Sequence, residues 1–145
     1  MIALIQRVTH ARVEVRQQTI AGINRGITAL IGIEKTDSTR NADRLLRRIL
    51  GYRIFPDNFQ KMNLSLTEIQ GDLLLVPQFT LPADTKKGMR PGFSTAAPPE
   101  QGKQLFDYLL VQARISHQPT AAGEFGADMQ LTLTNDGPVT FWLQS

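Results

Sequence analysis

Apolar and polar residues alternate along several short stretches of this chain, which is the pattern of half-buried β-strands. Val13 and Val15, for example, alternate with charged neighbours. Other stretches are almost wholly apolar, which is typical of strands buried on both faces. The pattern predicts strands at residues 2–9, 11–16, 27–33, 52–55, 72–79, 123–134 and 139–143, and a further extended segment at 61–66.

Two stretches carry a helical period instead. In the first, apolar residues recur at the spacing of one helix face, and these residues are Ala42, Leu45, Leu46, Ile49 and Leu50. Cap-type residues precede them at 36–39, and Gly51 is expected to end the helix. The second helix is expected to begin at Pro98 and Pro99, because proline is tolerated in a first turn, and to run to Ser116.

This order of elements predicts one α/β domain over residues 1–145, with a mostly antiparallel sheet and both main helices on one sheet face. The chain shows no repeat, no low-complexity tract and no linker that would divide it. Residues 82–99 are rich in Pro, Gly, Lys, Thr and Ser and predict a long irregular loop. A loop of that length in a compact domain is functional or disordered.

Composition narrows the class of protein. Apolar residues make up 41% and charged residues 20%, and cysteine is absent. Disulfides and thiol catalysis are therefore excluded, which fits a reducing compartment. The first residues do not have the pattern of a signal peptide, and no apolar run approaches membrane-spanning length. The sequence therefore predicts a cytoplasmic protein that does not bind a membrane.

The net charge is +3, and the basic residues are unevenly placed. One cluster falls in the first predicted helix and consists of Arg40, Arg44, Arg47 and Arg48. A second falls in the long loop and consists of Lys86, Lys87 and Arg90. A solvated surface explains such clusters, and contact with nucleic-acid phosphates is the functional alternative.

Two segments are candidates for chemistry. Gln78 and Thr80 follow the most hydrophobic strand, where a sheet holds functional side chains rigidly, although a Gln there can also simply satisfy backbone groups. Gly137-Pro138 separates two β-patterned runs, as an ordinary turn or as a rigid, unusual backbone. No nucleophile–base pair, phosphate-binding loop or zinc motif is present. His10 and His117 are interpreted as structural or solvated. A site built from these segments would act by positioning and oxyanion stabilisation.

Together these segments resemble the bacterial D-aminoacyl-tRNA deacylase family, in the same order and over essentially the whole chain. The resemblance rests on Gln78-Phe79-Thr80-Leu81, Ala83-Asp84-Thr85, Gly88-Met89-Arg90-Pro91, Phe125-Gly126-Ala127-Asp128-Met129 and Asn135-Asp136-Gly137-Pro138-Val139-Thr140. It implies a homodimer of β/β/α layered, barrel-like domains with two active sites at the subunit interface. Such proteins hydrolyse the ester that joins a D-amino acid, or glycine, to tRNA. It implies neither a cofactor nor a metal.

The resemblance also implies roles for individual residues. Gln78, Phe79 and Thr80 would form the catalytic segment. The partner subunit would contribute Gly137 and Pro138, joined by a cis bond, to exclude L side chains, and Arg7 would hold that pair in place. Phe125 and Met129 would lie near the terminal adenosine of the substrate. Lys86, Lys87 and Arg90 are predicted from their charge to contact the tRNA.

Pro77 departs from the family pattern, which has Ser before the Gln. Proline removes a hydroxyl and a backbone N–H. A sister branch of the superfamily carries Pro-Gln-Ala-Thr here and discriminates less strictly by chirality, whereas Phe79 and Arg7 align this chain with the strict branch. Two hypotheses follow: an esterase that proofreads aminoacyl-tRNA, and a non-catalytic tRNA-binding or RNA-binding homologue whose activity Pro77 has altered.

Overall fold

The computed structural model describes residues 1–145, and its centre is a six-stranded sheet. Its strands are β1 (Ile2–Val15), β2 (Gln18–Ile23), β3 (Gly26–Gly32), β6 (Asp72–Pro77), β7 (Thr120–Ala122) and β8 (Met129–Gln144). The order is β2-β1-β3-β6-β7, and β8 pairs with the other side of β1. Only the β3–β6 and β6–β7 pairs of this sheet are parallel. The predicted α/β fold with a mostly antiparallel, barrel-like sheet is confirmed.

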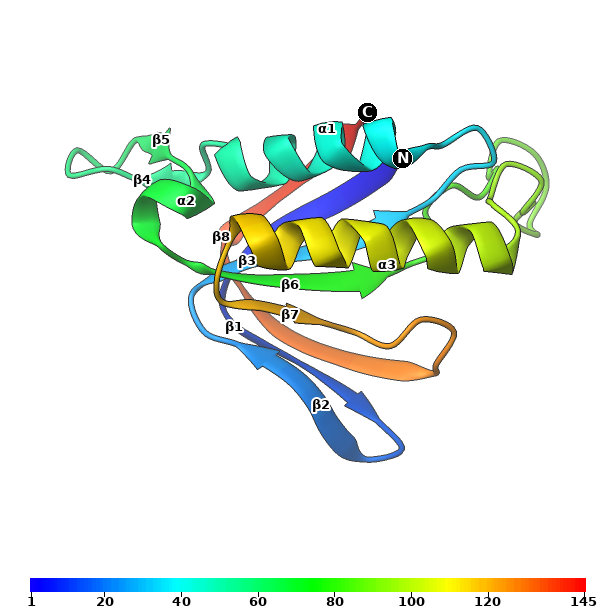
Figure 1. Cartoon of the computed structure of the whole chain (residues 1–145). Helices are drawn as coiled ribbons and strands as arrows, with labels where there is room; N and C mark the ends of the chain where they lie inside the picture. Colours follow the sequence, from blue (N-terminus) through cyan, green and yellow to red (C-terminus); the bar gives the residue numbers. More distant parts are fainter.

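Strand β1 explains why the sheet curls. Along one side it pairs with β8 over nearly its whole length. Along the other side, its first half pairs with β3 and its second half with β2. The sheet therefore bends between these halves, so that β2 and the lower part of β8 turn away from the helices (Figure 1). Sequence analysis predicted two strands at 2–9 and 11–16, but His10 does not interrupt the strand.

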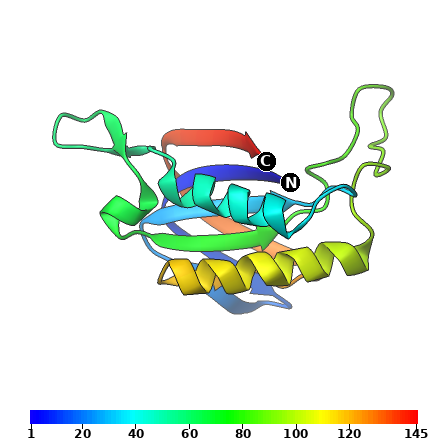
Figure 2. The same cartoon turned by 45° about the horizontal axis from the view of Figure 1, so that its top comes forward.

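Both main helices lie on one face of the sheet, as predicted (Figures 1 and 2). They are α1 (Thr39–Gly51) and α3 (Pro99–Ser116), close to the predicted bounds. Helix α1 begins with a capping box between Ser38 and Asn41, which satisfies orphan N–H groups of the first turn. Its apolar stripe packs on the sheet and on α3, and its buried members are Ala42, Leu45, Leu46 and Ile49.

A second, smaller core fills the inside of the curled sheet. Its buried residues come from opposite strands, and they are Val8, Ala11, Val13, Ile23, Leu74 and Val76. Because side chains alternate along a strand, β6 buries Leu73 and Leu75 under the helices and Leu74 and Val76 in the smaller core. The near-continuous apolar run of β6 thus reflects burial on both faces.

A small lobe extends from one end of the helix layer, at the left of Figure 1. It consists of β4 (Phe55–Pro56), β5 (Met62–Leu64) and the single-turn helix α2 (Leu66–Ile69). Sequence analysis placed a strand at 52–55 and an extended segment at 61–66, which are wrong in their bounds. Ser65 caps α2 and Glu68 completes the capping box, so the chain turns helical where extended structure was predicted.

Three further predictions of strand bounds are wrong. Residues 18–23 form β2, where the sequence pattern predicted no strand, and Gly22 lies within this edge strand. Strand β6 ends at Pro77 and not at Phe79, which releases residues 78–80 into a turn. Residues 123–128 leave the sheet between β7 and β8. In each case glycine or proline sits at the true boundary or within the strand.

The α-amino group of Met1 is buried beside two carboxylates. It lies 2.5 Å from Asp37 Oδ1 and 3.0 Å from Glu34 Oε2. Met1 is fully buried, and Asp37 is 9% exposed. These contacts tie the start of β1 to the connection between β3 and α1. None of the helices is both long and apolar enough to cross a membrane.

Candidate active site

A pocket of about 720 Å³ opens where β6 ends, between the long loop, the first turn of α3 and the segment that leads into β8. Eleven of its eighteen lining residues are hydrophobic. Four of the residues predicted to form the site line it, namely Gln78, Phe79, Phe125 and Met129. Pro77, the residue that departs from the family pattern, also lines it.

The turn after β6 is fixed by backbone contacts. The Gln78 N–H donates to the Ile31 carbonyl of β3 at 2.7 Å, and the Gln78 carbonyl accepts from the Leu81 N–H at 3.3 Å. The Gln78 side chain amide donates to Thr80 Oγ1 at 2.5 Å. The Thr80 hydroxyl is therefore already an acceptor for an amide and has no basic partner.

The backbone N–H groups of Phe79 and Thr80 donate to no acceptor in the protein. Both residues are exposed; Phe79 lines the pocket, and Thr80 lies next to it in the chain, outside the lining. Two adjacent free N–H groups on a fixed turn form a donor arrangement that can stabilise a developing oxyanion.

Two aromatic rings mark the edge of the pocket. Phe79 is 65% exposed and Phe93 44% exposed, and their ring centroids lie 5.3 Å apart. Exposed aromatic pairs of this kind offer flat apolar surface to a ligand. Phe93 was missed by sequence analysis, although an aromatic residue in an otherwise polar loop was the available signal.

Phe125 and Met129 also line the pocket. The Phe125 ring lies 6.2 Å from Phe106 of α3, measured between centroids. Gly102 faces Phe125 so closely that a Cβ there would come within 3.2 Å of the ring. The missing side chain at 102 therefore lets the Phe125 ring pack closely against the first turn of α3.

The second candidate segment forms a bulge in β8. Gln6 of β1 pairs with Thr140, and Val8 pairs with Asn135. The residues 136–139 therefore loop out opposite a single β1 residue, Arg7. A bulge inserts extra residues into one strand and re-aims its backbone. The Gly137–Pro138 peptide bond in this bulge is cis, as predicted, and so is Gln118–Pro119.

Hydrogen bonds from the side chains of Arg7 and Asn135 fix the backbone of the bulge. Arg7 Nε donates to the Asp136 carbonyl at 2.9 Å and lies 3.2 Å from Asp136 Oδ2, while Arg7 Nη1 donates to the Ile54 carbonyl at 2.7 Å. Asn135 Oδ1 accepts from the Val139 N–H at 2.6 Å, and its amide donates to the Val139 carbonyl at 3.2 Å. Both side chains thus span the base of the loop.

Glycine is required at the top of this bulge. Gly137 has φ of +143°, a conformation that L side chains rarely adopt. A Cβ there would also come within 2.6 Å of Val139 Cγ2. Gly137 and Pro138 are both exposed, and neither lines the pocket of its own subunit.

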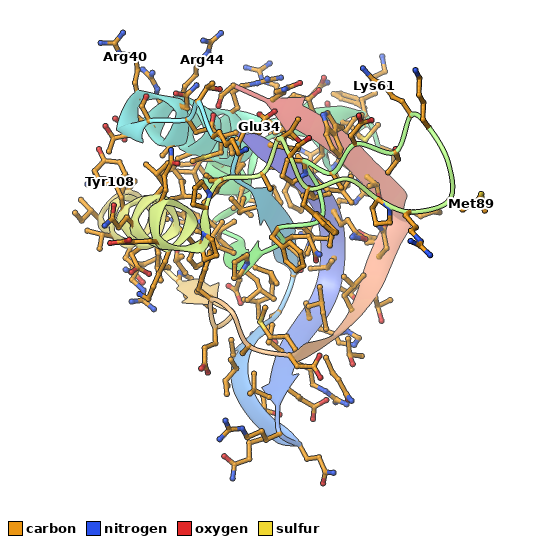
Figure 3. All side chains as sticks on the ribbon, turned by 90° about the vertical axis from the view of Figure 1, so that its right-hand side faces the viewer. Glu34, Arg40, Arg44, Lys61, Met89 and Tyr108 are labelled. Atoms are coloured by element: carbon orange, nitrogen blue, oxygen red, sulfur yellow. The ribbon has the colours of Figure 1, made fainter.

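The remaining predicted residues lie away from the pocket. Lys86, Lys87 and Arg90 are exposed in the long loop, which Asp84 and Gly92 pinch together through two backbone hydrogen bonds of 2.7 and 2.9 Å. Met89 lies at the far end of this loop and points away from the helices (Figure 3). The pocket is lined by Phe93 and by residues 96–99 of the long loop, and none of the three basic residues lines it.

Neither histidine belongs to the pocket. His117 is buried, with Nε2 2.6 Å from the Gly71 carbonyl, and His10 contacts Thr9 and Thr134. No group of three or more His, Cys, Asp or Glu residues is arranged to hold a metal ion.

The three residues whose pKa values are clearly shifted all lie outside the pocket. A hydrogen bond from the Lys61 N–H lowers the pKa of Asp57, and one from the Ser65 hydroxyl lowers the pKa of Glu68. A hydrogen bond to Asp43 raises the pKa of Tyr108. The hydrogen bonds that cause these pKa shifts belong to local turns and to the contact between α1 and α3, and none of them involves a residue of the pocket.

Known proteins match this chain over almost its whole length. A family model described as "D-Tyr-tRNA(Tyr) deacylase" matches residues 4–144. A D-aminoacyl-tRNA deacylase of Pseudomonas syringae pv. syringae is 60% identical over 141 residues, which are 97% of each chain. One of Nitrosococcus oceani is 58% identical over 144 residues, 99% of this chain and 93% of the relative.

Solved structures match as well. One described as a c-Myc DNA unwinding element binding protein has a TM-score of 0.95 at 40% identity, and covers 100% of this chain and 99% of its own. A probable eukaryotic D-amino acid tRNA deacylase has a TM-score of 0.86 at 17% identity, covering 99% and 98%, and shares the fold. The family model and the bacterial relatives confirm the predicted resemblance. The chain belongs to the D-Tyr-tRNA(Tyr) deacylase family.

Proposed function

We propose that this protein hydrolyses the ester bond between a D-amino acid, or glycine, and the 3′ end of tRNA, and that it acts in the cytoplasm. The observation that carries the proposal is the turn at Gln78–Thr80: its Phe79 and Thr80 N–H groups have no acceptor in the protein, and its residues Gln78 and Phe79 line a mostly apolar pocket. Family membership supplies the substrate class, and this donor pair suits the tetrahedral oxyanion of ester hydrolysis.

The active site is completed by a second copy of the chain. Gly137 and Pro138 are exposed on a bulge that two side chains hold rigid, yet they do not reach the pocket of their own subunit. A two-fold symmetric dimer places the same bulge of each subunit in the pocket of the other, which makes the two sites equivalent. This supports a homodimer in which neither subunit has a complete site alone.

Chirality is checked by the backbone of that bulge. The carbonyl groups of Gly137 and Pro138 approach the α-carbon of the bound amino acid, hold its amino group and leave no room for an L side chain. A rigid support is essential to such a check, because specificity by exclusion fails if the excluding wall can move. The contacts of Arg7 and Asn135 provide this support. Glycine has no side chain to exclude and is accepted.

No protein side chain acts as nucleophile or general base. The Thr80 hydroxyl accepts from the Gln78 amide, and no acidic residue or histidine lines the pocket. The attacking water is assisted instead by the free 2′-hydroxyl of the terminal ribose, next to the scissile ester. The Phe79 and Thr80 N–H groups stabilise the oxyanion, and loss of one such donor in other enzymes costs about 2.7–4 kcal/mol.

A second candidate function rests on one observation, the presence of Pro77 at the pocket wall. If this residue has abolished catalysis, the protein binds tRNA without hydrolysing it. The retained turn and bulge favour the enzyme, because binding alone requires neither of them.

A single assay separates the two functions. Purified protein is incubated with D-Tyr-tRNA, L-Tyr-tRNA and Gly-tRNA, and loss of the ester is followed over time. We expect D-Tyr-tRNA and Gly-tRNA to be deacylated and L-Tyr-tRNA to remain intact. Binding of all three without hydrolysis would establish the non-catalytic function instead.

The chemistry is tested with an altered substrate. D-Tyr-tRNA that ends in 2′-deoxyadenosine should bind normally and be hydrolysed far more slowly. Normal turnover of this substrate, or a trapped covalent acyl-enzyme, would contradict assistance by the 2′-hydroxyl.

A further inference from the structure

The pocket wall carries one charge. Among its eighteen lining residues, Lys35 is the sole ionisable side chain. Its ammonium group makes no ion pair and no hydrogen bond with the protein. The nearby acids in sequence, Glu34 and Asp37, contact the Met1 amine and not Lys35. Lys35 is therefore the single cationic residue of a mostly apolar pocket lining, and it has no ion-pair partner.

The backbone of Lys35 is fixed on both sides. Its N–H donates to the Thr95 carbonyl of the long loop at 3.1 Å. Its carbonyl accepts from the side chain amide of Gln101, in the first turn of α3, at 3.0 Å. The position of this residue is therefore set by two separate elements, while its charged end is free to contact a ligand.

Lys35 and the catalytic turn lie at two ends of one wall. Ile31, Ile33 and Lys35 alternate along the chain, and all three line the pocket. Gln78 is bound to the Ile31 carbonyl at 2.7 Å. Four residues of chain span at most about 14 Å, so Lys35 begins within that distance of the anchor point of the turn.

We propose that Lys35 is a positioning residue that binds the 5′-phosphate of the terminal nucleotide of the substrate, an inference that rests on the proposed function. With the ester at the turn, the nucleoside fills the apolar part of the pocket and its phosphate extends toward the only cation. An ammonium group on a flexible four-carbon stem is suited to a phosphate as a point charge. Lys35 thus sets the register of the nucleotide and does not take part in the chemistry.

The test uses two stable analogues that differ only in the phosphate. These are 3′-deoxy-3′-(D-tyrosylamino)adenosine and its 5′-monophosphate, in which an amide replaces the ester. Calorimetry gives the affinity of each for wild-type protein and for Lys35→Gln, Lys35→Arg and Lys61→Gln. Lys61 is an exposed lysine of the small lobe that does not line the pocket, and it serves as the matched control (Figure 3).

Wild-type protein should bind the phosphorylated analogue about tenfold more tightly, as expected for one charge-assisted contact. Lys35→Gln should lose this preference and bind the unphosphorylated analogue as wild type does. Lys35→Arg and Lys61→Gln should keep the preference. With D-Tyr-tRNA, Lys35→Gln should raise KM, leave kcat unchanged and reduce the salt slope of binding by about 0.7.

Two results would overturn the inference: a phosphate preference that persists in Lys35→Gln, or a wild-type protein that shows no preference between the analogues. Failure of the proposed function is seen separately, as wild-type protein that leaves D-Tyr-tRNA intact.

Discussion

Two short irregular segments interrupt the sheet, the turn at residues 78–80 after β6 and the bulge at residues 136–139 within β8. The turn keeps two backbone N–H groups free and faces the pocket of its own subunit. The bulge is held by hydrogen bonds from Arg7 and Asn135, and none of its residues lines that pocket. One segment thus offers donors to a substrate, while the other presents a rigid wall.

This difference shows how a site without an activated side chain can be selective. Donors on the turn need only a fixed backbone, which β3 provides through Ile31. A wall that excludes one enantiomer must resist displacement, and side-chain hydrogen bonds at its base supply that resistance. Catalysis and selectivity should therefore respond differently to substitution in the two segments.

The largest effect is expected from Gly137→Ala. The new Cβ would clash with Val139 and would require a φ that alanine avoids, so the bulge must shift. A misplacement of about 1 Å can cost on the order of a hundredfold in rate, and we expect a loss of that size together with hydrolysis of some L-Tyr-tRNA. Initial rates on both substrates provide the measurement.

Gly51→Ala is the matched control for this substitution. No atom lies within 4 Å of the Cβ that it would add on the outer face of α1, so its activity should equal that of wild type. An unaltered D/L ratio in Gly137→Ala would show that the bulge does not check chirality.

A smaller effect is expected from Arg7→Gln. The variant removes the guanidinium contacts to Asp136 and Ile54 but keeps a polar side chain. Loss of a partly buried charged hydrogen bond costs about 1.5–3 kcal/mol, so discrimination between D-Tyr-tRNA and L-Tyr-tRNA should fall about tenfold. The D-Tyr-tRNA rate should change less than the L-Tyr-tRNA rate. Equal changes in both would assign Arg7 a purely structural role.

Pro77→Ser addresses the turn. Serine restores a backbone donor and a hydroxyl at the end of β6 without disturbing the pairing of residue 77 with Ile31. The fold should be retained, and activity on D-Tyr-tRNA should be preserved or raised. A loss greater than about tenfold, or roughly 1.4 kcal/mol of barrier, would mean that proline is adapted to this turn.

A several-fold effect on tRNA binding alone is expected from neutralising Lys86, Lys87 and Arg90 together as glutamines. These residues lie outside both segments, so KM for tRNA should rise several-fold at low salt while kcat and the D/L ratio stay constant. The matched triple variant replaces Arg40, Arg44 and Arg47 on the exposed face of α1. A larger rise in KM for that variant would place the tRNA body along α1 instead.

Periodicity was enough to predict both main helices and the inner strands, because burial on one face imposes a period that the sequence records. The predicted strand boundaries near Pro77 and Gly123 were wrong, because local propensity does not reveal where pairing between strands ends. The prediction for the small lobe was wrong for a similar reason, because a capping box at Ser65 outweighs the strand-like pattern before it.

For the site, the sequence carried the motifs but not their geometry. Gln78 and Thr80 were identified at a strand end, yet the free N–H groups depend on the tertiary contact of Gln78 with Ile31. Lys35 and Phe93 were missed, because neither lies in a recognisable motif. Their place in the pocket arises from the packing of β3, the long loop and α3, which no local pattern encodes.

The central claim is that each active site combines the turn of one subunit with the bulge of another, and hybrid dimers test it most directly. Gly137→Ala spoils the bulge, and Ala127→Trp fills the pocket of its own chain. Each variant alone should be nearly inactive. After subunit exchange in equal amounts, about one quarter of wild-type activity should return, because half of the dimers then contain one intact site. Hybrid dimers that are confirmed by mass but show no recovered activity would contradict the claim.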